Sequence, residues 1–113
     1  MSAISTHVLD TSLGRPAAGI AVVLEVESGA GGWKEIGHGT TNSDGRAANL
    51  LAEGSLAEGT YRLTFETEAY FRSCAVHGFY PRVTVIFHVR DAKQHHHIPL
   101  LLSPYGYSTY RGS

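Results

Sequence analysis

Apolar and polar side chains alternate along three stretches of the chain, at residues 20–26, 61–66 and 83–90. In the first of these, Val22 and Leu24 fall on the same side of an extended backbone. A strand with one buried face and one solvated face produces this period of two. The pattern therefore predicts three strands that each turn one face toward a hydrophobic core.

Further strands are predicted at residues 5–10, 33–41, 94–102 and 105–113, where the alternation is less regular. Clusters of Gly, Asn, Asp and Pro separate the predicted strands and favour turns. Short strands at regular spacing, joined by turns, are typical of two sheets packed face to face. The sequence thus predicts an all-β fold, an antiparallel β-sandwich of seven to eight strands.

One stretch, residues 67–77, does not alternate. Tyr70 and Cys74 recur there at the spacing of one helix face. Thr67 is of a type favoured at helix N-caps, and Gly78 is of the type that ends helices. We therefore expect one short helix between two strands, with Cys74 as a small buried apolar residue.

The composition narrows the classes of partner. The length of 113 residues suits a single domain spanning 1–113. Nine basic and ten acidic residues give a net charge of -1, and no basic cluster suggests nucleic acid or an anionic membrane as a partner. The single cysteine excludes an internal disulfide, and neither a signal peptide nor an apolar membrane span is recognisable. A cytoplasmic location is expected.

Seven histidines are candidates for chemistry. Strand alternation places His95 and His97 on one face and His96 on the other, so these neighbours alone cannot form a three-histidine metal site. His95 and His97 could bind zinc with a third ligand from elsewhere, because an open zinc site needs roughly three protein ligands. No HExxH motif or cysteine pair supports such a site, so only adventitious metal is expected there.

Three other residues have both an ordinary interpretation and a functional one. His97 could be a strand histidine at a subunit contact, His7 a core histidine bound to a carbonyl group, and Arg46 a solvated residue after a turn.

Other catalytic templates are missing from the sequence. It contains no Gly-x-Ser-x-Gly elbow, glycine-rich phosphate loop, dinucleotide fingerprint or pair of neighbouring carboxylates.

The end of the chain, residues 105–113, reads Tyr-Gly-Tyr-Ser-Thr-Tyr-Arg-Gly-Ser. Chain ends are usually poorly ordered and chemically bland, whereas this one is suited to holding a small polar ligand. Together with residues 5–17, 44–46 and 97–104, it resembles the transthyretin-related 5-hydroxyisourate hydrolases, whose chains end in Tyr-Arg-Gly-Ser. The resemblance implies a transthyretin-like sandwich that contains a short helix.

The resemblance also implies an activity, the hydrolysis of 5-hydroxyisourate to 2-oxo-4-hydroxy-4-carboxy-5-ureidoimidazoline in urate degradation, a part of purine metabolism. It implies a homotetramer with active sites in a channel between subunits, a small-molecule substrate and no cofactor. In this interpretation His7 and His97 are catalytic, one activating water and the other orienting it or protonating the departing nitrogen. His7 is slightly preferred for the water.

The resemblance assigns further roles at the site. Arg46 would bind the substrate and stabilise negative charge, since a guanidinium can bind a planar, partly anionic ring in bidentate fashion. Tyr110 would contact the ring, and Arg111 would help to bind substrate. Ser113, with its hydroxyl and terminal carboxylate, completes the catalytic set.

Two alternatives come from other classes of protein. A transthyretin-type carrier shares the sandwich and the Leu-Leu-Ser-Pro-Tyr sequence but transports a hydrophobic hormone, for which polar His7, Arg46 and His97 are poorly suited. A regulatory sandwich module without activity is suggested by the Thr-Asn-Ser-Asp-Gly-Arg turn. The Tyr-Arg-Gly-Ser ending separates the hydrolase from both alternatives.

Overall fold

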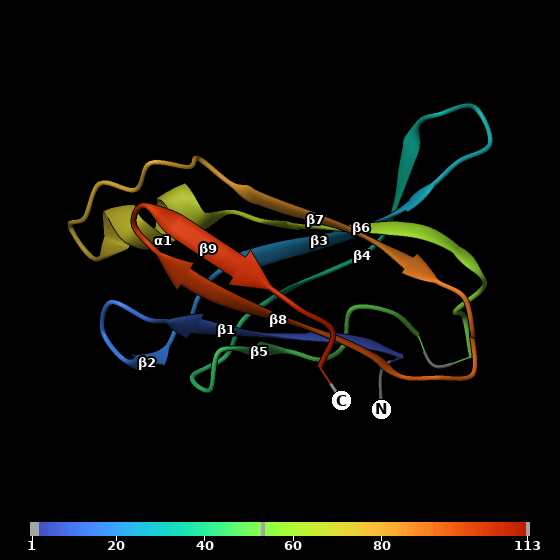
Figure 1. Ribbon diagram of the computed structural model, residues 1–113, viewed down its shortest axis with the longest axis horizontal. Helices are drawn as coiled ribbons and strands as arrows, with labels where there is room; N and C mark the ends of the chain where they lie inside the picture. Colours follow the sequence, from blue (N-terminus) through green and yellow to red (C-terminus); the bar gives the residue numbers. More distant parts are fainter. Residues whose placement is uncertain (1–2, 53, 113) are drawn as a thin grey trace.

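The computed structural model describes residues 3–52 and 54–112, which form nine strands and one helix. The strands lie in two sheets that enclose one core, in an elongated molecule of 39 × 29 × 20 Å (Figure 1). Sheet A has the order β2-β1-β8-β9, with β5 also paired to β1, and sheet B has the order β4-β3-β6-β7. The elements are β1 (Ile4–Asp10), β2 (Arg15–Pro16), β3 (Ala21–Glu27), β4 (Trp33–Thr40), β5 (Arg46–Ala47), β6 (Gly59–Phe65), α1 (Thr67–Ser73), β7 (Val83–Val89), β8 (His96–Ser103) and β9 (Gly106–Thr109).

The predicted sandwich is confirmed, and the predicted strands are present with small shifts at their ends, except that the strand predicted at 105–113 is shorter and ends at Thr109. The additional strands β2 and β5 have two residues each, too short to produce a recognisable alternation. All strand pairs are antiparallel except β1 and β8, which run parallel over Ile4–Asp10 and His96–Leu102. A period of two is the same in both directions, so this pairing could not be predicted from the pattern.

The alternation in β1 decides which side chains face the core. Ile4, Thr6, Val8 and Asp10 are buried, while the residues between them are only partly buried. In the same way β6 buries Tyr61, Leu63 and Phe65, and burial of one such apolar side chain contributes roughly 1.5–3 kcal/mol. Sheet A therefore has an outer face on which Ser5 and His7 stand.

The helix α1 lies between β6 and β7, as expected, but its ends differ from the prediction. The N-cap is Glu66 and makes no side-chain cap bond, whereas Thr67 is helical and its hydroxyl donates to the carbonyl of Tyr80 at 3.3 Å. The helix ends at Ser73, before Gly78, and Ala75 adopts a positive φ of 57°. The prediction of a buried Cys74 was also wrong, because this residue just beyond the helix is exposed. No helix in the described ranges is long and apolar enough to cross a membrane.

Asp10, at the end of β1, connects the sandwich to the helix. The carboxylate is almost completely buried and accepts bonds from the hydroxyls of Tyr70 at 2.7 Å and Ser12 at 2.6 Å. It also accepts the backbone N–H groups of Ser12 and Leu13. Burial alone would raise the pKa of Asp10, but these bonds together outweigh it and hold the pKa below the ordinary value of 3.8.

We expect Asp10→Asn to destabilise the fold by about 1–3 kcal/mol, because hydrogen bonds to a charged acceptor are replaced by weaker ones. The lowered pKa of Asp10 stabilises the folded state above pH 3.8, and this contribution is lost as the pH falls through the folded pKa. Urea titrations between pH 7 and pH 2 measure the free energy of unfolding. In Asp10→Asn this free energy should not show the decrease at low pH that comes from Asp10 in the wild type. Tyr70→Phe removes one of the donors that lower the pKa of Asp10 and keeps the carboxylate, so it should weaken this pH dependence in the same direction. Equal acid dependence in wild type and Asp10→Asn would contradict this assignment.

Candidate functional site

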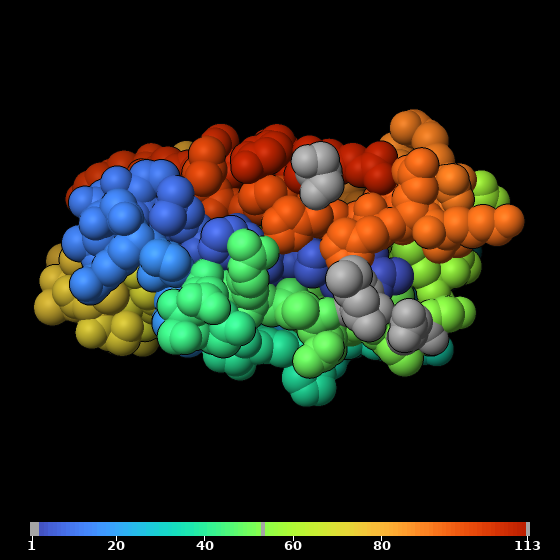
Figure 2. All heavy atoms as spheres, turned by 90° about the horizontal axis from the view of Figure 1, so that it is seen from below, coloured from blue at the N-terminus to red at the C-terminus, as the bar shows by residue number. Residues whose placement is uncertain are grey.

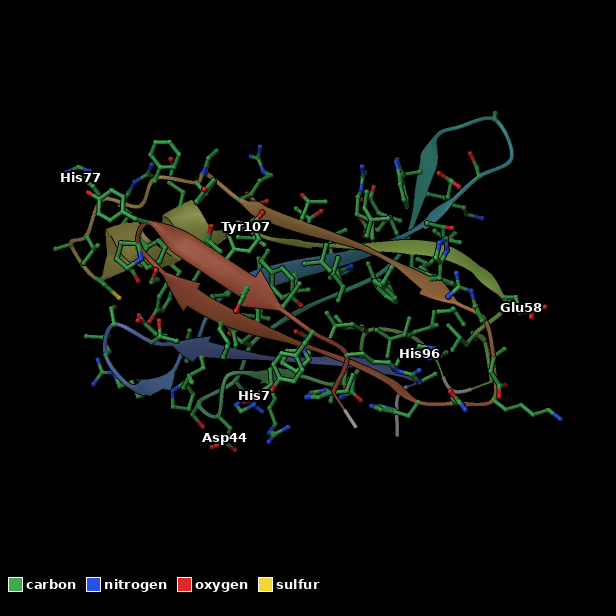
Figure 3. All side chains as sticks on the ribbon, viewed as in Figure 1. His7, Asp44, Glu58, His77, His96 and Tyr107 are labelled. Carbon is green, nitrogen blue, oxygen red and sulfur yellow. The ribbon has the colours of Figure 1, made fainter. Side chains whose placement is uncertain are left out.

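The register of sheet A brings together residues from distant parts of the chain. On β1, Ser5 lies opposite His97 of β8, and His7 lies opposite Arg46 of β5. Figure 2 shows this face, with β1 in dark blue between β8 in orange and the residues around β5 in green. In Figure 3, His7 lies at the outer side of β1 beside the turn that carries Asp44. The structure thus places His7, Arg46 and His97 in one neighbourhood.

A tight turn positions Arg46 beside β1. The side chain of Asn42 accepts the backbone N–H groups of Asp44 at 2.9 Å and Arg46 at 3.0 Å. Gly45 has a φ of 75° and passes so close to β1 that a Cβ would lie 2.4 Å from the carbonyl oxygen of Val8. Only glycine fits this close approach with a positive φ. The turn therefore fixes where the Arg46 backbone enters sheet A.

Among the described residues, no carboxylate forms an ion pair with the guanidinium of Arg46. Its side chain is exposed. A guanidinium presents several N–H donors in one plane and suits a flat anionic ligand. The arrangement can therefore attract negative charge to the outer face of sheet A.

The histidines of β8 and of the segment before it divide as the alternation predicted. His96 is 4% exposed, and its Nδ1 lies 2.9 Å from the carbonyl oxygen of Gln94. His95 and His97 face the other way, with ring centroids 6.4 Å apart and an interplanar angle of 24°. Among residues 3–52 and 54–112, no group of three or more His, Cys, Asp or Glu side chains is arranged to hold a metal ion.

His97 has the electrostatic surroundings of a neutral imidazole. Burial lowers its pKa from the ordinary 6.5, and the charges of Arg46, His95 and His7 lower it further, against a hydrogen bond with the Ser5 backbone that raises it. The protonated form is disfavoured because it would be partly desolvated and repelled by these neighbours. At neutral pH, His97 is therefore able to accept a proton.

Ser5 connects the two outward histidines, and the sequence analysis did not identify it as a site residue. Its Oγ lies 2.8 Å from Nε2 of His95 and 2.8 Å from Nδ1 of His97. Ser5 shares the outward parity of His7, which is visible in the sequence. Its contact with His97 depends on the parallel pairing of β1 with β8, for which the sequence gives no signal.

The C-terminal segment returns across β8 after β9 ends. Thr109 donates through its hydroxyl to the carbonyl of Pro99 at 2.7 Å, and the N–H of Gly112 donates to the carbonyl of His97 at 2.8 Å. A Cβ at Gly112 would lie 2.6 Å from Cδ2 of His97, so the absence of a side chain there lets the segment lie against the imidazole. The end of the chain thus packs on a predicted site residue.

Tyr110 and Arg111 have a different location from the other predicted site residues. Both line a pocket of about 260 Å³ together with residues of β7 and β8, and this lining includes neither His7, Arg46 nor His97. Arg111 turns back to Gln94, donating to its Oε1 at 3.0 Å. Ser113, the remaining predicted site residue, lies outside the described residues.

Comparisons with known proteins show what this chain is similar to. The model of the HIUase/Transthyretin family matches residues 4–112. A Rhizobium meliloti protein named 5-hydroxyisourate hydrolase 2 is 50% identical over 116 residues, which cover 97% of this chain and 95% of that protein.

Two solved structures show the same fold with different functions in their names. The 5-hydroxyisourate hydrolase of Klebsiella pneumoniae has a TM-score of 0.84 and 37% identity, covering 97% of this chain and 98% of that chain. Sea bream transthyretin in complex with thyroxine has a TM-score of 0.92 and 31% identity, covering 96% of this chain and 93% of that chain. Backbone similarity alone therefore does not separate an enzyme from a carrier.

Proposed function

The chain belongs to the HIUase/transthyretin family, and we propose that it is an enzyme that hydrolyses 5-hydroxyisourate. The product would be 2-oxo-4-hydroxy-4-carboxy-5-ureidoimidazoline, which places the reaction in urate degradation. The observation that carries the proposal is the position of His7, Arg46 and His97 on one outer face of sheet A. These groups supply a proton acceptor and a fixed positive charge.

The reaction consists of the attack of water on a ring carbonyl, followed by opening of a C–N bond. We assign the proton from water to His97, because burial and the nearby charge of Arg46 lower its pKa and favour the neutral imidazole. This assignment replaces the slight preference for His7 that followed from sequence. His7 would then orient the water or protonate the departing nitrogen.

The remaining site residues would act on the substrate. Arg46 binds the ring and stabilises the negative charge that develops on the attacked carbonyl oxygen. Within one chain Tyr110 and Arg111 line a different pocket, so they would contact the substrate only in the proposed channel between subunits, and Ser113 would contribute its hydroxyl and carboxylate. Contacts of Gly112 with His97 support a role for this segment in ordering the site.

The carrier alternative is less consistent with this face. Sea bream transthyretin is named with thyroxine, an iodinated aromatic hormone, whereas His7, Arg46 and His97 place polar and cationic groups where such a ligand would need apolar contact. The names of the more identical relatives also favour the enzyme over a regulatory module.

Absorbance decay of freshly generated 5-hydroxyisourate, with and without the protein, tests the proposal. Acceleration over the spontaneous decay, in proportion to protein concentration, is the expected result. Binding of thyroxine without any acceleration would favour the carrier instead. The location in the cytoplasm stays a prediction.

We further propose a homotetramer. Exposed aromatic side chains support it, because Tyr105 is 73% and Tyr107 42% exposed, and tyrosine is favoured at interfaces. The edge strands β7 and β9 also offer unpaired backbone groups that a second subunit could cover.

The mass in solution should be near four times 12.2 kDa. Light scattering coupled to size-exclusion chromatography measures this directly at micromolar concentration. Dilution should lower the mass and the specific activity together, because the site would lie in a channel between subunits. A fully active monomer would refute the shared channel.

A further inference from the structure

The hydroxyl of Ser5 lies between two imidazole rings, which restricts where hydrogens can be. Its Oγ is 2.8 Å from Nε2 of His95 and from Nδ1 of His97, within hydrogen-bond distance of both. A serine hydroxyl has one hydrogen to donate and two lone pairs that accept. It therefore donates to at most one of the two rings, and the other ring must carry its own N–H toward Ser5.

This restriction links the tautomers of the two histidines. A neutral imidazole carries its hydrogen on one nitrogen and accepts at the other. If His97 is to accept a proton from water at Nε2, its Nδ1 must carry the hydrogen and donate to Ser5. The hydroxyl of Ser5 then donates to Nε2 of His95, and all three groups are satisfied.

We propose that Ser5 is a positioning residue that holds His97 in the Nδ1–H tautomer, with His95 as the acceptor that orients the Ser5 hydroxyl. This inference rests on the proposed function for its effect on turnover, but the tautomer itself does not depend on it. The parallel register keeps Ser5 directly opposite His97. The exposed His95 therefore belongs to the site without touching the substrate.

The arrangement makes the two rings respond together to pH. A protonated His95 carries hydrogens on both nitrogens and cannot accept from Ser5. The Ser5 hydroxyl is then free to donate to Nδ1 of His97, which favours the tautomer that cannot act as a base. The other charged groups around His97 are Arg46 and His7, and Arg111 approaches the carbonyl oxygen of His95 at 3.4 Å.

Ser5→Ala should lower kcat by about 10- to 100-fold, as is typical when the partner that orients an active histidine is lost. KM should change little, because Ser5 is proposed to act through His97 and not on the substrate. Ser5→Thr retains a hydroxyl and should restore most of the activity. His95→Ala should resemble Ser5→Ala, although a merely exposed side chain would tolerate this change. The acid limb of the pH profile should be less steep in both alanine variants than in the wild type.

Thr60→Ala is a matched control, because Thr60 forms an exposed hydroxyl–histidine contact with His88 at 3.3 Å on sheet B. This variant should keep wild-type kinetics. A wild-type kcat and pH profile in Ser5→Ala would overturn the proposal, as would a loss in Ser5→Thr equal to that in Ser5→Ala.

Nitrogen-15 NMR of the histidine rings in the assembled, full-length protein tests the tautomer without any substrate. At neutral pH, His97 should carry its hydrogen on Nδ1 in the wild type and shift toward a mixture in Ser5→Ala. A wild-type His97 with its hydrogen on Nε2 would refute the inference. A protein that fails to hydrolyse 5-hydroxyisourate but shows the expected tautomer would refute the proposed function alone.

Discussion

Alanine at His7, Arg46 or His97, introduced one at a time, is expected to reduce kcat/KM for 5-hydroxyisourate by at least about 10²-fold. Each change removes a proton-transfer group or the fixed charge, and none of the three belongs to the buried apolar core. The melting temperature and the oligomer mass should therefore stay close to those of the wild type. Initial rates of substrate decay, corrected for spontaneous decay, measure the effect.

Two further variants sharpen this test. Arg46→Lys keeps the charge but loses the planar set of donors, so it should fall between Arg46→Ala and the wild type. His38→Ala removes a histidine of β4 whose Nδ1 lies 3.2 Å from Oε2 of Glu35, away from the proposed site, and it should keep full activity. Wild-type rates in all three alanine variants would contradict the site assignment.

Deletion of residues 110–113 is the second change with a large expected effect. It removes a phenol, a guanidinium and the Ser113 hydroxyl, yet takes nothing from the buried apolar core as far as the structure describes it. Turnover per folded protein should fall at least as far as in the alanine variants, while stability falls modestly. Correctly assembled, truncated protein with the wild-type rate would show that the tail has no function.

A point change separates the position of the tail from its chemistry. Gly112→Ala removes no functional group, but its Cβ would lie 2.6 Å from Cδ2 of His97, so the ring or the tail must move. We expect a clear loss of kcat. The matched control is Gly106→Ala in β9, where a Cβ would meet its nearest atom, Oγ of Ser103, at an ordinary 3.7 Å. Equal activity of the two variants would argue against a positioning role for Gly112.

The sequence predicted the strands well, because burial of one face imposes a period of two that is visible without any partner. It predicted the helix α1 but not its ends. Thr67 was expected at the N-cap because threonine is favoured there, but its hydroxyl bonds to the carbonyl of Tyr80 instead. The prediction for Cys74 failed because the helix ends before it. Contacts that depend on tertiary structure override such local preferences.

The candidate site was predicted unevenly for a similar reason. His7, Arg46 and His97 were identified from the resemblance, and the parity of β8 correctly separated His96 from its neighbours. The role of Ser5 could not be found, because it requires the direction and the register of a strand pair. Parity along one strand shows which side chains share a face, but not which other strand completes that face.

The parallel pairing of β1 with β8 also affects how the protein is made. The ribosome synthesises β1 long before β8, the strand that lies along its whole length. Until then, β1 has only the two-residue partners β2 and β5, and its apolar side chains have no complete core to enter. Contacts between such distant segments slow folding and leave partly folded chains prone to aggregation. Chaperone dependence should therefore be greatest for nascent chains that have not yet completed β8.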